Sequence, residues 1–87
     1  MATYRVEWKS SAIREIRRLD RQAIPRVIDA IDSLSSDPLP RGSRKLHAGE
    51  RTYRIRVGDY RVVYEILEGE SVVEIIRVRH RSEAYQT

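Results

Sequence analysis

The sequence contains no cysteine, and it has only three prolines and four glycines among 87 residues. Without cysteine, neither disulfide bonds nor thiolate metal sites can stabilise the fold, which suits a reducing cytoplasm. No apolar run approaches the roughly 18 residues of a membrane-spanning helix, and the N-terminal MATYRVEWKSS lacks the apolar core of a signal peptide. These absences predict a soluble cytoplasmic protein with no membrane segment.

The chain also lacks a Gly/Ser linker, a low-complexity tract and an internal repeat. We therefore expect residues 1–87 to form one domain. At this length a domain buries only roughly 60–65% of the surface that its unfolded chain exposes, so the core is marginal. A bound partner or an oligomer would add stability.

Arginine is the residue type in excess. The formal net charge is +4, and 15 of the 17 basic residues are arginine. The planar guanidinium group binds phosphate in a bidentate manner, which the lysine ammonium does not. This composition suits an anionic partner, although a solvated basic surface would have the same composition.

The N-terminal half predicts one strand and two helices. Residues 4–8 alternate with period two, and the helix after them has Ser10 or Ser11 as a possible cap. A second helix has Asp20 as a possible cap and tolerates Pro25 only in its first turn. Prolines 38 and 40 end it. Its apolar stripe, which predicts a face turned to the core, consists of Ile24, Val27, Ile28, Ile31 and Leu34.

The C-terminal half predicts four strands, at residues 44–48, 51–57, 60–67 and 72–80. The order is β-α-α-β-β-β, with 44–48 as a short additional strand. The expected fold class is α+β, in which an N-terminal helical hairpin covers one face of a single antiparallel sheet.

Gly58 and Asp59 form a two-residue turn of type II′ or I′, which fixes the pairing of the strands on either side. Val57 then lies opposite Tyr60, and Arg56 lies opposite Arg61. One face of this hairpin carries Tyr53, Ile55, Val57, Tyr60, Val62 and Tyr64. The other face carries Arg54, Arg56 and Arg61.

The last strand has two possible registers. A four-residue loop without a bulge would place Arg77 opposite Val62, in the core. A three-residue loop or a bulge instead places Val78 opposite Val62 and Ile76 opposite Tyr64, and we prefer this register. It leaves Glu74 near the apolar face, but it sets Arg79 beside Arg61.

Four arginines, at positions 54, 56, 61 and 79, are therefore expected to converge on the face that the helices leave open. Like charges directly opposite each other destabilise a sheet, and only Glu65 is a candidate to neutralise them locally. A site that accepts this cost is suited to an anion. The alternative is that long arginine side chains simply cover an exposed sheet face.

The C-terminal segment VRHRSEAYQT adds a histidine, an aromatic ring and a further cation. Guanidinium groups hold phosphates, an aromatic ring such as that of Tyr85 stacks on a base, and the imidazole of His80 moves protons near neutral pH. Each signal is weak alone, because a single tyrosine such as Tyr85 or a single histidine such as His80 more often has a structural role. Together they favour a nucleic-acid partner. The basic residues expected to bind RNA outside the catalytic group are Arg44, Lys45, Arg51 and Arg81.

The segments YRIRVGDYRVVYEI and VVEIIRVRHRSEAY, in this order, resemble the RelE branch of the RelE/ParE toxin superfamily. The resemblance covers nearly the whole chain. It implies a ribosome-dependent endoribonuclease that cuts messenger RNA in the A site, is silenced by a small antitoxin in a toxin–antitoxin hetero-oligomer, and uses no metal or other cofactor. It further implies that a 2′-hydroxyl attacks the adjacent phosphorus and leaves a cyclic phosphate.

By position, the resemblance assigns catalytic roles to Arg61 and Arg79 and base stacking to Tyr85. Arg54 and Arg56 occupy positions where relatives have basic residues, often lysines. Arginine keeps its proton, so neither suits the role of general base. The remaining candidate is His80, with Glu83 behind it, although the register turns His80 towards the helices. Two alternatives stay open: a ParE-like inhibitor of DNA gyrase with the same fold, and a non-catalytic RNA-binding module.

Overall fold

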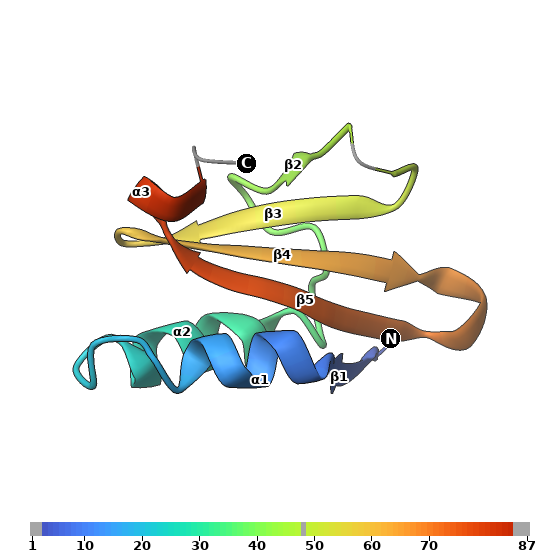
Figure 1. Ribbon diagram of the computed structural model, residues 1–87. Helices are drawn as coiled ribbons and strands as arrows, with labels where there is room; N and C mark the ends of the chain where they lie inside the picture. The colour runs from blue at the N-terminus through green and yellow to red at the C-terminus, as the bar shows by residue number, and fades with distance from the viewer. Residues whose placement is uncertain (1–2, 48, 85–87) are drawn as a thin grey trace.

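The computed structural model describes residues 3–47 and 49–84 as a five-stranded sheet with two longer helices (Figure 1). The sheet order is β1-β5-β4-β3-β2. The elements are β1 (Arg5–Trp8), α1 (Ser10–Ile16), α2 (Ile24–Ser33), β2 (Arg44–Lys45), β3 (Thr52–Val57), β4 (Tyr60–Leu67), a 3₁₀ turn η1 (Glu68–Glu70), β5 (Val72–His80) and α3 (Arg81–Ala84).

The predicted α+β class is confirmed, with one difference in the sheet. β2, β3, β4 and β5 pair antiparallel to their neighbours, but β1 runs parallel to β5. The sheet is therefore mixed. The helical hairpin between β1 and β2 separates these two strands, which lie at opposite edges of the sheet. The predicted strand at 44–48 is shorter than expected, as β2 contains only Arg44 and Lys45.

The serines at the start of α1 do not cap it. The N-cap position is Lys9, and no side chain caps the helix there. Ser11 instead donates its hydroxyl to the carbonyl of Ile76 on β5, at 3.1 Å. Asp20 likewise does not cap α2, whose N-cap is Ala23; its carboxylate accepts the backbone N–H of Gln22 at 3.2 Å.

The core lies between the two helices and one face of the sheet. It contains the predicted stripe residues Val27, Ile31 and Leu34, and Ile24 and Ile28 pack at its margin. Tyr64 is fully buried, and its hydroxyl donates to the carbonyl of Pro38 at 2.7 Å. This bond fixes the segment that crosses from α2 to β2. The sheet contributes Ile55, Val62, Tyr64, Ile66, Val73, Ile75 and Val78.

The β3–β4 hairpin has the predicted register, with Val57 opposite Tyr60 and Arg56 opposite Arg61. Gly58 has φ +60°, while Asp59 is not in the left-handed region, which is the pattern of a type II′ turn. The glycine is needed here because a side chain strains that backbone conformation.

The β4–β5 pairing contains a β-bulge between Val63 and Tyr64. Val78 lies opposite Val62, as predicted, but the residue opposite Tyr64 is Ile75 and not Ile76. Ile76 is the extra residue of the bulge and has no partner on β4. Ile75 before the bulge and Val78 after it therefore both point into the core.

The bulge also corrects the placement of Glu74. This residue lies opposite Glu65, away from the apolar face where the expected register had left it. The register error was therefore local, because Arg79 still lies opposite Arg61.

Candidate functional site

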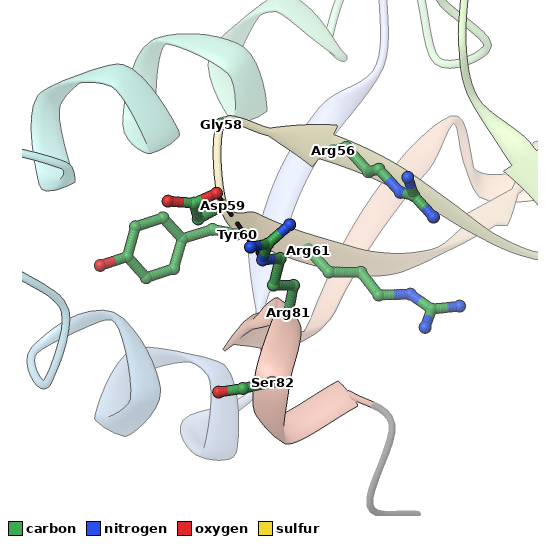
Figure 2. A pocket seen from close by; sticks show the side chains of 7 residues that line it. All are labelled: Arg56, Gly58, Asp59, Tyr60, Arg61, Arg81 and Ser82. Atoms are coloured by element: carbon green, nitrogen blue, oxygen red, sulfur yellow. Dashed lines mark ion pairs between the residues drawn. The ribbon is translucent and has the colours of Figure 1, made fainter.

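The β3–β4 turn and the start of α3 enclose a pocket of about 240 Å³ (Figure 2). The turn contributes one wall, and α3 reaches it because the chain leaves β5 directly beside the turn. Three of the lining side chains are cationic. The lining residues are Arg56, Gly58, Asp59, Tyr60, Arg61, Arg81 and Ser82.

Arg56 and Arg61 lie directly opposite each other on β3 and β4. Figure 2 shows the two side chains extending in the same direction, away from the turn. The Nε atom of Arg61 is buried and has no hydrogen-bond partner among the residues that the structure describes. Buried donors are usually paired, so Arg61 carries an unsatisfied donor at the edge of the pocket.

Arg81 fastens α3 to the turn. Its backbone N–H donates to the carbonyl of Asp59 at 2.8 Å, and its Nε lies 3.9 Å from Asp59 Oδ1. The ion pair is exposed on both sides and adds little stability. The Arg81 guanidinium therefore remains available to a ligand in the pocket, where it lies beside Asp59 at the turn (Figure 2).

Arg79 lies opposite Arg61 but is held by a carboxylate on α1. Its Nε donates to Glu15 Oε2 at 2.9 Å, and Arg77 reaches the same oxygen at 3.4 Å. The expectation that only Glu65 can neutralise the arginines is therefore wrong. Arg79 lines a neighbouring groove of about 230 Å³ together with Glu15, Arg18, Leu19, Tyr60, Val78 and His80.

Arg54 does not lie on an open surface. It is only 7% exposed, and its Nη1 donates to the carbonyl of Gly42 at 3.2 Å. This contact ties β3 to the loop before β2. Of the four arginines predicted to converge, Arg56, Arg61 and Arg79 lie side by side on neighbouring strands. Arg81 joins Arg56 and Arg61 in the lining of the pocket, while Arg54 has a structural partner.

The other basic residues predicted to bind RNA are exposed but do not line the pocket. Arg44 lies opposite Arg54, and both border a depression of about 510 Å³ that also includes Arg41 and Arg56. Lys45 lies on β2, and Arg51 lies in the turn before β3. Tyr85 lies outside the described residues.

His80 lies opposite Tyr60, and the two rings meet edge to face with centroids 5.5 Å apart. Its Nδ1 accepts the backbone N–H of Ser82 at 3.2 Å and lies 2.9 Å from the Ser82 hydroxyl. In the neutral ring this assignment places the proton on Nε2. His80 thus lies on the helix side, as expected. Its Nδ1 is already occupied by the backbone N–H of Ser82 in the first turn of α3.

Sequence reasoning missed Glu15. Its role depends on where β1 ends relative to β5, which is a long-range relationship with no local sequence signal.

Across residues 3–47 and 49–84, no group of three or more His, Cys, Asp or Glu side chains could hold a metal ion. No helix in these same stretches is long and apolar enough to cross a membrane.

Comparison with known proteins agrees with this geometry. Residues 6–85 match the family described as "ParE toxin of type II toxin-antitoxin system, parDE". Toxin RelG of Mycobacterium tuberculosis is 31% identical over 84 residues, which cover 95% of this chain and 97% of the relative.

Two solved toxin–antitoxin complexes have the same fold. The archaeal RelE–RelB complex from Pyrococcus horikoshii matches with a TM-score of 0.80 and 30% identity, over 91% of this chain and 96% of that one. The RelBE2 complex of Mycobacterium tuberculosis matches with a TM-score of 0.78 and 33% identity, over 91% and 99% of the two chains.

The mixed sheet, the helical hairpin and these matches define a toxin of a type II toxin–antitoxin module. The chain belongs to the ParE toxin family and is a RelE-like member of the RelE/ParE superfamily.

Proposed function

We propose that this toxin is a ribosome-dependent endoribonuclease that cleaves messenger RNA in the A site and thereby stops translation. The observation that carries the proposal is the pocket that Arg56, Arg61 and Arg81 line, together with Arg79 on β5, which lies directly opposite Arg61 on β4. A phosphodiester is the ligand class that such a group of guanidinium donors recognises.

In the proposed reaction, a 2′-oxygen attacks the adjacent phosphorus, and the bond to the 5′-oxygen of the next nucleotide breaks. The products are a 2′,3′-cyclic phosphate and a 5′-hydroxyl; the proton lost by the 2′-hydroxyl is balanced by the one that the leaving oxygen gains. Charge accumulates on the phosphoryl oxygens in the transition state, and preorganised guanidinium groups stabilise it. Arg61 has this role in our proposal, because it lines the pocket and lies directly opposite both Arg56 and Arg79.

Arg79 and Arg56 supply further positive charge on either side of Arg61, and Arg81 binds the RNA backbone at the mouth of the pocket. Tyr85 follows α3, and we assign it stacking on a base, which would align the 2′-oxygen with the scissile bond. Arg54 contributes by holding β3 and its neighbouring loop in place, as its bond to Gly42 supports.

We assign His80 primarily a structural role, in which its Nδ1 holds the first turn of α3 through the N–H of Ser82. To act as a base through Nδ1, it would have to release the N–H of Ser82. Arg44, Lys45 and Arg51 remain proposed contacts to more distant parts of the RNA or ribosome. A toxin that acts on translating ribosomes works in the cytoplasm.

We further propose that a small antitoxin binds this chain and silences it in a hetero-oligomer. The solved relatives are toxin–antitoxin complexes, which supports this partner. Ile13 on α1 and Leu39 in the α2–β2 segment are large apolar side chains that remain exposed, at 37% and 51%. A bound partner that covers them would also stabilise the marginal core.

The test is in vitro translation of a defined messenger, with RNA ends mapped by primer extension. Wild-type protein should produce cuts at A-site codons on ribosomes and none on naked RNA. Arg61→Ala should lower the cleavage rate about a hundredfold or more, as expected for the loss of one transition-state donor. Arg5→Ala is the matched control, because it removes the same charge from an exposed ion pair with Glu7 on β1. Intact RNA with the wild-type protein would refute the proposal.

The second candidate function is inhibition of DNA gyrase, and the family description of the match as a ParE toxin favours it. In this case the arginine pocket would bind a protein or DNA surface without cleavage. A supercoiling assay separates the two functions: blocked gyrase together with intact messenger RNA would support the ParE-like activity.

A further inference from the structure

The edge of β5 is left open after residue 75, and α1 takes over its pairing. β1 pairs with β5 only as far as Trp8, which lies opposite Ile75. Beyond this point Ser11 donates to the carbonyl of Ile76 at 3.1 Å, and Glu15 accepts the N–H of Val78 at 2.9 Å. Residues four apart lie on the same face of a helix, so one face of α1 satisfies two successive edge groups of the strand.

The same Glu15 carboxylate also binds the side chain of Arg79. Oε1 accepts the Val78 N–H, while Oε2 accepts the Arg79 Nε at 2.9 Å. The side chains of Glu15 and Arg79 are 18% and 24% exposed, so this pair is more shielded from water than a surface ion pair. The backbone N–H of Val78 thus holds one oxygen of the carboxylate, and the other oxygen holds the Arg79 guanidinium through Nε.

The geometry leaves the two terminal Nη groups of Arg79 available to a ligand. Glu15 contacts Nε only, and among the described residues no hydrogen bond engages the two terminal Nη groups. An arginine held through Nε has its plane and reach restricted, while the Nη donors can still approach a phosphate. Because the Arg79 side chain is already ordered, it loses less conformational entropy when it binds a ligand.

We propose that Glu15 is a positioning residue: it orients Arg79 for the scissile phosphate through the shared contact with the Val78 N–H. This inference rests on the proposed ribonuclease function. Arg77 also reaches Glu15, but at 3.4 Å and with a side chain 47% exposed, so it is a peripheral partner of the same carboxylate.

The first experiment compares cleavage by Glu15→Ala, Arg79→Ala and the double variant. Glu15→Ala should lower the maximal cleavage rate at saturating ribosomes by about tenfold or more, since small misplacement of a catalytic group costs up to roughly a hundredfold. The ribosome concentration at half-maximal rate should stay within about twofold, because Glu15 binds no substrate in this arrangement. In the Arg79→Ala background the Glu15 substitution should change the rate by less than about twofold, the signature of residues that act together.

Two controls separate positioning from a general role in packing. Ser11→Ala removes the neighbouring α1–β5 hydrogen bond, and Arg77→Ala removes the other cation on Glu15. Both should leave the cleavage rate within about twofold of wild type, because neither alters the Nε contact. An equal loss in Ser11→Ala would assign the effect to the α1–β5 junction and overturn the inference. An unchanged rate in Glu15→Ala, or the same factor in both backgrounds, would also overturn it.

The second experiment does not depend on activity. Nitrogen-edited NMR should show a resolved, slowly exchanging Arg79 Nε–H signal in the wild-type protein and in Arg77→Ala. Glu15→Ala should lose that signal while the dispersed amide spectrum shows the protein still folded. The absence of this signal in the wild-type protein would refute the contact between Glu15 and Arg79 Nε. If the contact is present but the wild-type protein cuts no RNA, the proposed function fails, and with it the role of Glu15 in cleavage.

Discussion

Arg61 on β4 lies directly opposite both Arg56 on β3 and Arg79 on β5. Three arginines therefore form a row across three adjacent strands, about 4.8 Å apart in backbone spacing. Like charges in directly opposed positions destabilise a sheet. Among the described residues, only the member on β5, Arg79, has a carboxylate partner, which is Glu15. The centre of the row thus carries a local cost in stability that a bound phosphate would offset.

Arg61→Gln should separate stability from cleavage. Glutamine keeps much of the aliphatic side chain but removes the charge and the buried, unpaired Nε. We expect the free energy of unfolding to stay unchanged or rise by up to about 1 kcal/mol, because cross-strand repulsion is relieved. The cleavage rate should fall about a hundredfold. Urea unfolding and the translation assay measure the two effects, and a loss of stability above about 1 kcal/mol would show that Arg61 is structural.

Arg54→Ala should behave in the opposite way to Arg56→Ala. Arg54 is buried and hydrogen-bonded to Gly42, so its removal leaves a carbonyl without a donor and a gap beside β3. We expect a loss of about 1–3 kcal/mol in the free energy of unfolding. Arg56 is exposed, and its replacement should change stability by less than about 0.5 kcal/mol. Equal stability of the two variants in urea would contradict the structural role of Arg54.

The hairpin at the centre of the site was predictable because its determinants are local. The glycine at position 58 and the two-residue turn fix the pairing of Arg56 with Arg61, and the alternation of apolar residues confirms the faces. The burial of Arg54 was not predictable, because it depends on a loop carbonyl that the sequence pattern does not place. The same holds for the parallel pairing of β1 and for Glu15, which meets β5 only where β1 ends.

The register of β5 was predicted correctly on only one side of the β-bulge. The pattern of apolar residues predicted Val78 opposite Val62, and the structure confirms this pairing. The prediction of Ile76 opposite Tyr64 was wrong, because packing on both faces of the sheet decides the position of a bulge. Placing Ile75 inward buries its side chain fully and moves Glu74 away from the core, which no single-strand pattern reveals.

Gly58→Ala should destabilise the hairpin that carries Arg56 and Arg61. The backbone of Gly58 has φ +60°, and an L-residue there costs about 1–2 kcal/mol. Gly69→Ala is the matched control, because a side chain at that position would meet nothing within 4 Å and no positive φ is required. It should leave stability unchanged or raise it by up to about 1 kcal/mol. Thermal unfolding of the two variants checks the difference, and equal melting temperatures would contradict the assigned turn.

Tyr64 should make the fold sensitive to alkaline pH. Burial raises the pKa of Tyr64 from 10.0 to about 12, so the folded state keeps this proton at pH values where the unfolded chain has released it. The stabilisation is fully present below pH 10 and is lost as the pH rises from 10 to about 12. A two-unit difference corresponds to roughly 2–3 kcal/mol.

Tyr64→Phe isolates this effect from the other groups that titrate in the same range. The variant should lose about 1 kcal/mol at neutral pH, because the carbonyl of Pro38 loses its donor. Between pH 10 and 12 its free energy of unfolding should fall less steeply than that of the wild type, so that the two curves converge and then cross before pH 12. Urea unfolding across this range measures the difference between them. Parallel curves would mean that the Tyr64 hydroxyl ionises in the folded protein as readily as in the unfolded chain, and that the bond to Pro38 does not shield it.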